Sequence, residues 1–261
     1  MRIPFYQIDA FTDRLFGGNP AAVCVLDRWL EDSVLQAIAA ENNLSETAFL
    51  VGRNGRYALR WLTPKVEVDL CGHATLATAY VVFRHLEPSL REVAFDSRSG
   101  ELRVSRAGDL MTLDFPAIHG QRCACPMQLS EGLGREPLEV WRAAKYLCVF
   151  AEEDDIRALQ PDFSRLADLE LMGVIATAPG HSVDFVSRMF APRVGIPEDP
   201  VTGSAHCMLA TYWAARTGNT LFNAKQLSSR GGDLGCELRG DRVLISGRAV
   251  QYLQGEILLN P

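Results

Sequence analysis

The sequence predicts an α+β fold of two pseudo-symmetric halves, each a mostly antiparallel β-roll or barrel around a buried central helix. The chain has 261 residues, 48% of them hydrophobic and 22% charged, so it can bury a sizeable core. Many short strand-like segments with few helices between them favour an antiparallel arrangement over a doubly wound parallel sheet. Two similar segments about half a chain apart indicate that the halves are copies of one unit.

The internal repeat relates residues 63–80, TPKVEVDLCGHATLATAY, to residues 191–211, APRVGIPEDPVTGSAHCMLAT. Each segment passes through a proline, a basic residue, a valine and an acid before a glycine opens an apolar helix. The matched glycines, Gly72 and Gly203, are separated by close to half of the chain. A single short match could also arise by chance, so the repeat alone does not decide the architecture.

Two apolar helices are predicted at the repeated segments, over residues 72–86 and 203–217. Apolar side chains lie on every side of the first of these helices, as Leu76 and Phe83 illustrate. A helix that is hydrophobic all round must be buried all round. We therefore place one such helix at the centre of each half. The segments 31–41 and 161–169 are predicted to be surface helices.

Alternating or β-branched stretches supply the strands. They cover residues 5–9, 21–26, 47–51, 58–63, 92–96, 101–106 and 110–115 in the first half, and 145–150, 171–178, 183–190, 225–231, 236–239, 242–247 and 249–257 in the second. Residues 116–138, rich in Gly, Pro and charge, are expected to cross between the halves. We assign residues 1–116 to the N-terminal half and 117–261 to the C-terminal half, with the last strand free to return to the first half.

Composition excludes several classes of partner. A formal charge of −6 without a Lys/Arg cluster argues against nucleic acid. Asp9 and Asp13 interrupt the apolar stretch that a secretory signal needs, and the longest apolar run, residues 74–83, is far short of the ~20 residues of a membrane span. Seven cysteines without a regular spacing fit reduced thiols, and the Cys123-x-Cys125 pair has no second pair with which to bind zinc. We therefore expect a cytoplasmic protein.

Glu46 is the first candidate for chemistry. It lies in NNLSETAFLV, where period-2 alternation places it on the same strand face as Ala48 and Leu50. A carboxylate on an apolar face loses hydration, which raises its pKa and suits it to general acid/base work near neutral pH. An exposed glutamate at the start of a strand is an equally open interpretation.

His73 follows Gly72 in the first turn of the predicted buried helix. Free backbone N–H groups at that end suit an anion. A histidine that only satisfies its own loop is the alternative. In EDPVTGSAH, Glu198 and Asp199 precede a Thr-Gly-Ser turn at the start of the second helix, although Thr202 or Ser204 could simply be an N-cap.

Other motifs point less sharply to chemistry. Gly17-Gly18-Asn19-Pro20 reads as a tight turn between strands. The sequence contains no P-loop, dinucleotide fingerprint or zincin motif. Cys71 could be a thiolate activated by the helix start, but a small buried hydrophobe is the more ordinary role. A metal held by Cys71, His73, His206 and Cys207 would need ligands from both helix starts, so we predict no metal.

The fragments IDAFTDRLFGGNPAAV, NNLSETAFL, TPKVEVDLCGHATLATAY and FAPRVGIPEDPVTGSAH together resemble the phenazine-biosynthesis PhzF-like isomerase family, from Ile8 to about Trp213. The resemblance implies a diaminopimelate epimerase-like fold with the active site in a cleft between the halves. It implies that Glu46 moves a proton between two substrate carbons and that His73 and Asp199 are catalytic residues holding the substrate's polar groups. The remaining implied substrate-binding residues are Asn19, Ser45, Gly72, Gly203 and Ser204.

The resemblance also implies that no cofactor is needed, and that the substrate is a small cyclic or amino carboxylate. Related epimerases use one cysteine from each half as paired bases, whereas here Cys71 precedes the Gly-His pair and no cysteine matches Asp199. An amino-acid racemase using Cys71 and a non-catalytic small-molecule binder stay open as alternatives. We expect a homodimer.

Overall fold

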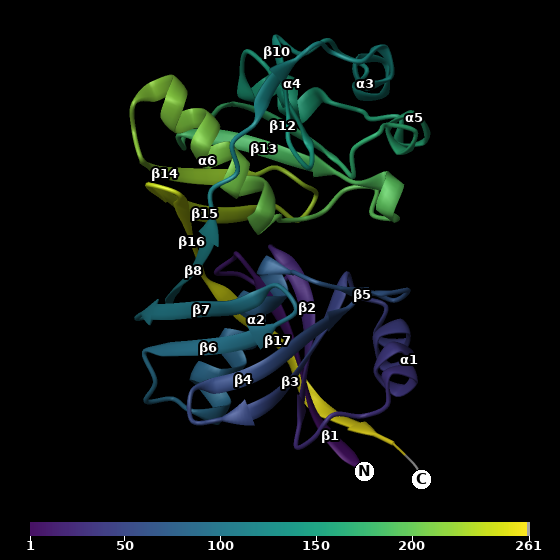
Figure 1. The fold of residues 1–261 in the computed structure, drawn as a ribbon, viewed down its shortest axis with the longest axis vertical. Coiled ribbons are helices and arrows are strands. Elements are labelled where there is room, and N and C mark those ends of the chain that lie inside the picture. The colour runs from purple at the N-terminus through teal and green to yellow at the C-terminus, as the bar shows by residue number, and fades with distance from the viewer. Residues whose placement is uncertain (260–261) are drawn as a thin grey trace. The chain divides into compact units, whose positions relative to one another are not determined.

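The computed structural model describes residues 1–259, which form two compact units (Figure 1). Unit 1 comprises residues 1–114 together with the C-terminal segment from Ser246, and unit 2 comprises residues 115–245. The final strand, β17 (Ala249–Leu258), therefore belongs to unit 1. Strands outnumber helices in both units, and the predicted α+β class is confirmed.

Unit 1 is a roll of mostly antiparallel strands. Its elements are β1 (Arg2–Ala10), β2 (Asn19–Leu26), α1 (Asp32–Asn42), β3 (Glu46–Arg53), β4 (Arg56–Leu62), β5 (Glu67–Val68), α2 (Gly72–Val81), β6 (Glu92–Ser97), β7 (Gly100–Ala107), most of β8 (Leu110–Pro116), and β17. Strand β1 pairs antiparallel with both β2 and β17, while β2–β3 and β4–β6 are parallel pairs.

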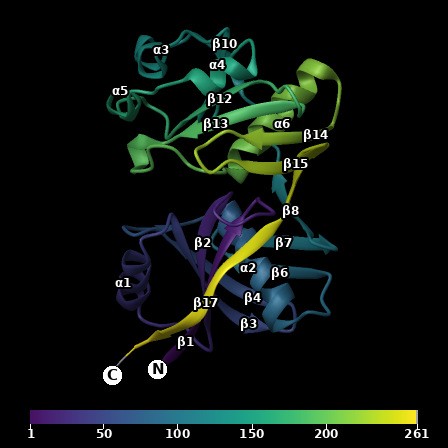
Figure 2. The same cartoon turned by 180° about the vertical axis from the view of Figure 1, so that it is seen from behind.

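Helix α2 lies inside this roll. Strands β4, β6 and β7 pass on one side of it in Figure 1, and β1 and β17 pass on the other side in Figure 2. Eight of its ten residues are buried, as the all-round apolar pattern requires. The α-helix ends at Val81 rather than at the predicted residue 86, because the chain continues as a π-helical turn, Val82–Leu86, closed by Glu87 N–H donating to the Val82 carbonyl at 2.7 Å.

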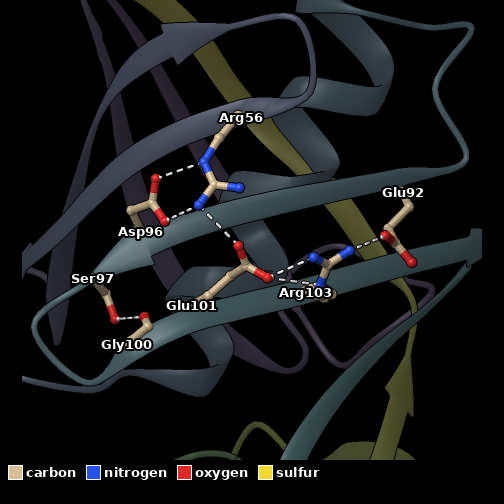
Figure 3. Close-up of polar contacts among 7 residues, drawn as sticks. All are labelled: Arg56, Glu92, Asp96, Ser97, Gly100, Glu101 and Arg103. Carbon is tan, nitrogen blue, oxygen red and sulfur yellow. Dashed lines mark hydrogen bonds and ion pairs between the residues drawn. The ribbon is translucent and has the colours of Figure 1, made fainter.

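The outer face of β4, β6 and β7 is charged. Figure 3 shows Arg56 paired with Asp96 and Glu101, and Arg103 paired with Glu101 and Glu92. These side chains are solvent-exposed, so each pair adds at most ~1 kcal/mol to stability. These charged pairs therefore identify the solvent-facing side of the sheet, and the opposite side is buried.

Unit 2 also places strands against a buried helix. Its elements are β9 (Gln121–Cys123), α3 (Met127–Leu133), β10 (Glu139–Arg142), β11 (Tyr146–Val149), α4 (Glu153–Ala158), α5 (Phe163–Ala167), β12 (Val174–Pro179), β13 (Phe185–Phe190), a 3-10 turn (Pro192–Val194), α6 (Gly203–Thr217), β14 (Leu221–Gln226), β15 (Gly232–Arg239) and most of β16 (Arg242–Gly247). Helix α6 lies across β13, β14 and β15 in both views (Figures 1 and 2). Its bounds match the predicted helix 203–217.

Two sequence predictions in unit 2 were wrong. The strand predicted over 225–231 is β14, which lies earlier and points Phe222, Ala224 and Gln226 inward. Residues after Gln226 turn instead, with Gly231 at φ +67° and its N–H bonded to Ser228 Oγ. The predicted crossover 116–138 contains β9 and α3.

All seven cysteines lie in the described part of the chain, and none forms a disulfide. Within residues 1–259, no helix has both the length and the apolarity that a membrane span requires.

Candidate active site

A tight turn delivers Asn19 to the start of β2. Gly18 has φ +61°, and a Cβ there would lie 2.1 Å from the Ala10 carbonyl oxygen, so only glycine fits. The Asp9 carboxylate accepts a hydrogen bond of 2.9 Å from Phe16 N–H and ties the loop to β1. Asn19 then pairs with Ala10 across the β1–β2 ladder and is wholly buried.

Strand register places Asn19 and Glu46 on one face. Glu46 lies opposite Ala21 in the parallel β2–β3 pair, and directly paired residues point to the same side of a sheet. Asn19 is two residues before Ala21 and therefore shares that side. Glu46 is only 8% exposed, so of the two interpretations of this glutamate, the structure supports the buried one.

His73 bridges these two side chains from the first turn of α2. Its Nε2 atom lies 3.2 Å from Glu46 Oε2, and its Nδ1 atom lies 3.2 Å from Asn19 Nδ2. Burial lowers the pKa of His73 to about 3, so the ring is neutral at pH 7 and carries one proton.

The partners of His73 assign that proton to Nε2. The Asn19 amide nitrogen can only donate, so Nδ1 accepts, and the ring proton lies on Nε2, the atom that faces Glu46. The result is a chain of contacts in which Asn19 donates to His73 Nδ1 and His73 Nε2 faces Glu46 Oε2 at 3.2 Å. The arrangement places a neutral imidazole beside the buried Glu46 carboxyl group.

Cys71 also reaches this cluster, with Sγ 3.5 Å from His73 Nδ1. Potential ligand atoms of Glu46, Cys71 and His73 all lie within 4.8 Å of one another. The carboxylate approaches Nε2, however, while the sulfur approaches Nδ1 on the other side of the ring. The nearest contacts of Glu46 and Cys71 are therefore with different ring nitrogens.

The start of α2 also offers backbone donors. Cys71 is the N-cap residue, and its side chain does not cap the helix. The helical ladder begins with Thr75 N–H donating to the Cys71 carbonyl at 3.1 Å. The N–H groups of the first turn, from Gly72 onward, therefore have no helical acceptor and suit an anion such as a carboxylate.

In unit 2, Asp199 and Thr202 meet just before α6. The Thr202 hydroxyl donates to Asp199 Oδ2 at 2.5 Å. Thr202 is the N-cap residue but makes no side-chain cap, so the N-cap alternative is wrong for its hydroxyl. Ser204 Oγ lies 3.3 Å from Lys145 Nζ, and burial lowers the pKa of Lys145, while the Asp199 charge acts in the opposite direction.

Gln226 holds this loop in place and was missed by the sequence reasoning. It is wholly buried; its Oε1 accepts from Thr202 N–H at 2.9 Å, and its Nε2 donates to the Asp199 carbonyl at 2.6 Å. The strand was predicted over residues 225–231, and that placement did not indicate that Gln226 points inward at the end of β14. Glu198, in contrast, is held by Arg188 through bonds of 2.7 and 2.9 Å, so this carboxylate is structural.

The remaining predicted residues lie beside these two clusters. Ser45 is half-buried directly before β3, and Gly72 opens α2. In unit 2, buried Gly203 opens α6 and half-buried Ser204 follows it. Glu46, His73 and Asn19 are thus brought together in unit 1, while Asp199, Gly203 and Ser204 lie near one another in unit 2.

Comparison with known proteins identifies the family. A family model described as phenazine biosynthesis-like protein matches residues 8–255. The chain belongs to this family. An uncharacterized isomerase of Pseudomonas aeruginosa is 55% identical over 259 residues, covering 99% of this chain and 100% of the relative. The predicted family and the predicted isomerase class are confirmed.

Solved structures agree with this assignment. The crystal structure of a PhzF-family phenazine biosynthesis protein from Enterococcus faecalis is 47% identical, with a TM-score of 0.97 over 99% of this chain and 100% of that chain. A probable proline racemase from Agrobacterium radiobacter, with bound carbonate, has a TM-score of 0.66 at 11% identity, covering 99% of this chain and 94% of the other. That similarity shows a common fold.

Proposed function

We propose that this isomerase moves a proton between two carbons of a small carboxylate-bearing substrate without a cofactor, with Glu46 as the general acid and base. The buried chain Asn19–His73–Glu46 is the observation that supports this proposal. It holds the buried Glu46 carboxyl group in a defined position beside His73, and a general base has to be positioned within reach of the proton that it abstracts. A cytoplasmic location and a homodimer remain predictions from the sequence.

In the first step, Glu46 takes a proton from a substrate carbon next to a double bond. The electrons of the broken C–H bond form a new C=C bond, and the electrons of the old double bond shift to the far carbon. Glu46, now a carboxylic acid, returns the proton to that far carbon, so atoms and charge balance. The His73 Nε2–H group favours the ionised form of Glu46 and thereby promotes the second transfer.

Substrate anchoring is proposed for the same region of unit 1. The uncapped N–H groups at the start of α2 would bind the substrate carboxylate and contribute roughly 0.3–2 kcal/mol. From the family resemblance, we also propose Asn19 and Ser45, and Asp199, Gly203 and Ser204 in unit 2, as residues that contact the substrate.

A racemase would need two bases, and the second unit offers no suitable thiol near the start of α6. Cys207 lies one turn into that helix, and burial raises its pKa to about 12, so it stays protonated at neutral pH. Cys71 alone cannot both remove and replace a proton from opposite faces of one carbon. The structure therefore favours the glutamate mechanism.

A metabolite-extract screen tests the proposal. Wild-type protein should deplete one small carboxylate and accumulate a compound of equal mass, while Glu46→Gln should leave the extract unchanged and keep the wild-type circular dichroism spectrum. Cys71→Ser serves as the matched control and should behave as wild type. Depletion by Glu46→Gln at a rate within a few-fold of wild type would remove Glu46 from the mechanism.

A further inference from the structure

Unit 2 contains a cavity that the proposed reaction does not use. Its volume is about 400 Å³, within the range of small-molecule sites. It is lined by His119, Gly120, Glu139, Trp141, Leu147, Met208, Thr211, Tyr212, Ala215 and Arg216. The lining residues of α6 begin at Met208, about one turn after Ser204, and extend to Arg216, and no residue of the Asp199 loop lines the cavity.

Contacts within the protein fix the aromatic wall of this cavity. The rings of Trp141 and Tyr212 meet edge to face, with centroids 5.8 Å apart and planes at 70°. Trp141 Nε1–H donates to Glu139 at 3.1 Å, and Glu139 accepts a second bond from Arg216 at 2.8 Å. These contacts fix the plane of the indole, so a flat ring that packs against it has little ordering cost to overcome.

The charges around the cavity leave a positive excess. Burial acts to raise the pKa of Glu139, but hydrogen bonds from Trp141 and Arg216 and the nearby Arg122 charge outweigh burial, so the pKa is lowered. One ionised carboxylate therefore faces two guanidinium groups. Arg216 donates to Glu139, also interacts with the Tyr212 hydroxyl, and is half exposed, so that other N–H donors of its five are available to a ligand.

A buried polar group also lies at the wall. Tyr212 is 8% exposed, and burial raises the pKa of its hydroxyl, while the charge and a side-chain hydrogen bond of Arg216 act in the opposite direction. This hydroxyl adds a further polar group beside the apolar surface of the cavity.

We propose that this cavity binds a flat aromatic molecule with one anionic group, such as an aromatic carboxylate. Its ring packs between Trp141 and the apolar side chains of Leu147 and Met208, and its anionic group pairs with Arg216. This site and its ligand are independent of the Glu46 chemistry.

Binding of 2-naphthoate to protein labelled with ¹⁵N-tryptophan tests the proposal, because the chain has four tryptophans and Trp141 alone among them lines the cavity. We expect the indole signal of Trp141 to shift saturably with one equivalent bound. Uncharged 2-naphthylmethanol should bind at least ~10-fold more weakly, because it loses the charge-assisted bond. Arg216→Met should reduce that preference to nearly none.

Variants that fill the cavity provide the matched pair. Ala215→Phe adds a ring at the exposed mouth and should weaken 2-naphthoate binding at least ~10-fold. Ala144→Phe adds the same ring at an exposed turn outside the cavity and should bind as wild type.

Three results would overturn the inference. The first is no saturable shift of the Trp141 signal. The second is equal affinity in the two phenylalanine variants. The third combines two measurements: the affinity for 2-naphthoate falls as the protein concentration rises, and sedimentation shows a self-association that Ala215→Phe abolishes. A second copy of the chain would then cover the cavity. Should Ala215→Phe fail to fold, the comparison of acid with alcohol in Arg216→Met decides the question.

Discussion

Replacing Asn19 by aspartate exchanges only the side-chain NH₂ group for an oxygen. This change tests the chain of contacts from Asn19 through His73 to Glu46. In the wild-type protein, the amide donates to His73 Nδ1 at 3.2 Å, while Nε2 lies 3.2 Å from Glu46 Oε2. Aspartate cannot donate, and its carboxylate would instead demand a proton on Nδ1. The ring would then lie between two carboxylates.

The size of the effect follows from the Asn19 bond. A neutral hydrogen bond contributes a net ~0.5–1.5 kcal/mol, so this bond favours the Nε2–H form by about that amount. That preference corresponds to roughly 2- to 10-fold, so the Nε2–H form predominates. In Asn19→Asp the two carboxylates compete, and the imidazolium form that satisfies both becomes favourable, so the pKa of His73 rises above its low wild-type value.

Long-range ¹H–¹⁵N spectra of His73 measure this directly. Wild type should show one protonated nitrogen, Nε2, at pH 7, and Asn19→Asp should show both nitrogens protonated and turnover reduced at least ~100-fold, because Glu46 is then paired with a cation and is a weaker base. Asn19→Leu, which removes the donor without adding charge, should keep the Nε2–H form and lose about 10-fold. A neutral Nε2–H ring in Asn19→Asp would refute the chain.

Three further predictions concern other parts of the molecule. Cys71→Ser should retain turnover within about threefold, because a hydroxyl can also donate to His73 Nδ1; complete loss with the fold retained would favour the racemase. Gln226→Met should lower the free energy of unfolding in urea by about 1–3 kcal/mol because two backbone groups of the Asp199 loop lose their partner, whereas exposed Gln254→Met should change it by less than ~0.5 kcal/mol. Burial lowers the pKa values of His73 and His206 to about 3 and about 4, below the ~6.5 of an unfolded chain. Between pH 4 and ~6.5 the unfolded state therefore binds more protons, and stability that is present above pH ~6.5 is lost as the pH falls toward 4. His206→Asn should reduce the slope of the unfolding free energy against pH by up to ~1.4 kcal/mol per pH unit, and an unchanged slope would contradict the buried neutral form of His206.

The two central helices could be predicted because a long segment with apolar side chains on every side indicates a helix buried on every side. A segment such as 203–217, apolar on every side, has to be buried all round, and Gly203 and Gly218 punctuate its ends. Short elements were harder. Helix α3 is only seven residues long, and it lies between Pro126 and Gly134, which has φ +68°. Proline and glycine so close together in the sequence are also typical of a loop.

Part of the candidate site could be predicted from local patterns. Alternation along β3 pointed to Glu46, and the helix start pointed to His73. Their contact depends on the register of β2 against β3 and on the packing of α2, which no local pattern contains. For the same reason, no local pattern indicated that Asn19 contacts the His73 ring, or that Gln226 holds the Asp199 loop from a different strand.

Solvent-deuterium incorporation during turnover tests the central claim most directly. Once the screen has supplied a substrate, the reaction is run in D₂O and the product is analysed by mass spectrometry and NMR. A glutamate that takes and returns one proton should place deuterium at the far carbon of some product molecules, at a fraction set by how fast the Glu46 proton exchanges with solvent. Glu46→Gln should abolish both product formation and incorporation, a loss of at least ~100-fold, because an amide cannot exchange the proton. Product formed by Glu46→Gln with the wild-type deuterium pattern would contradict the account.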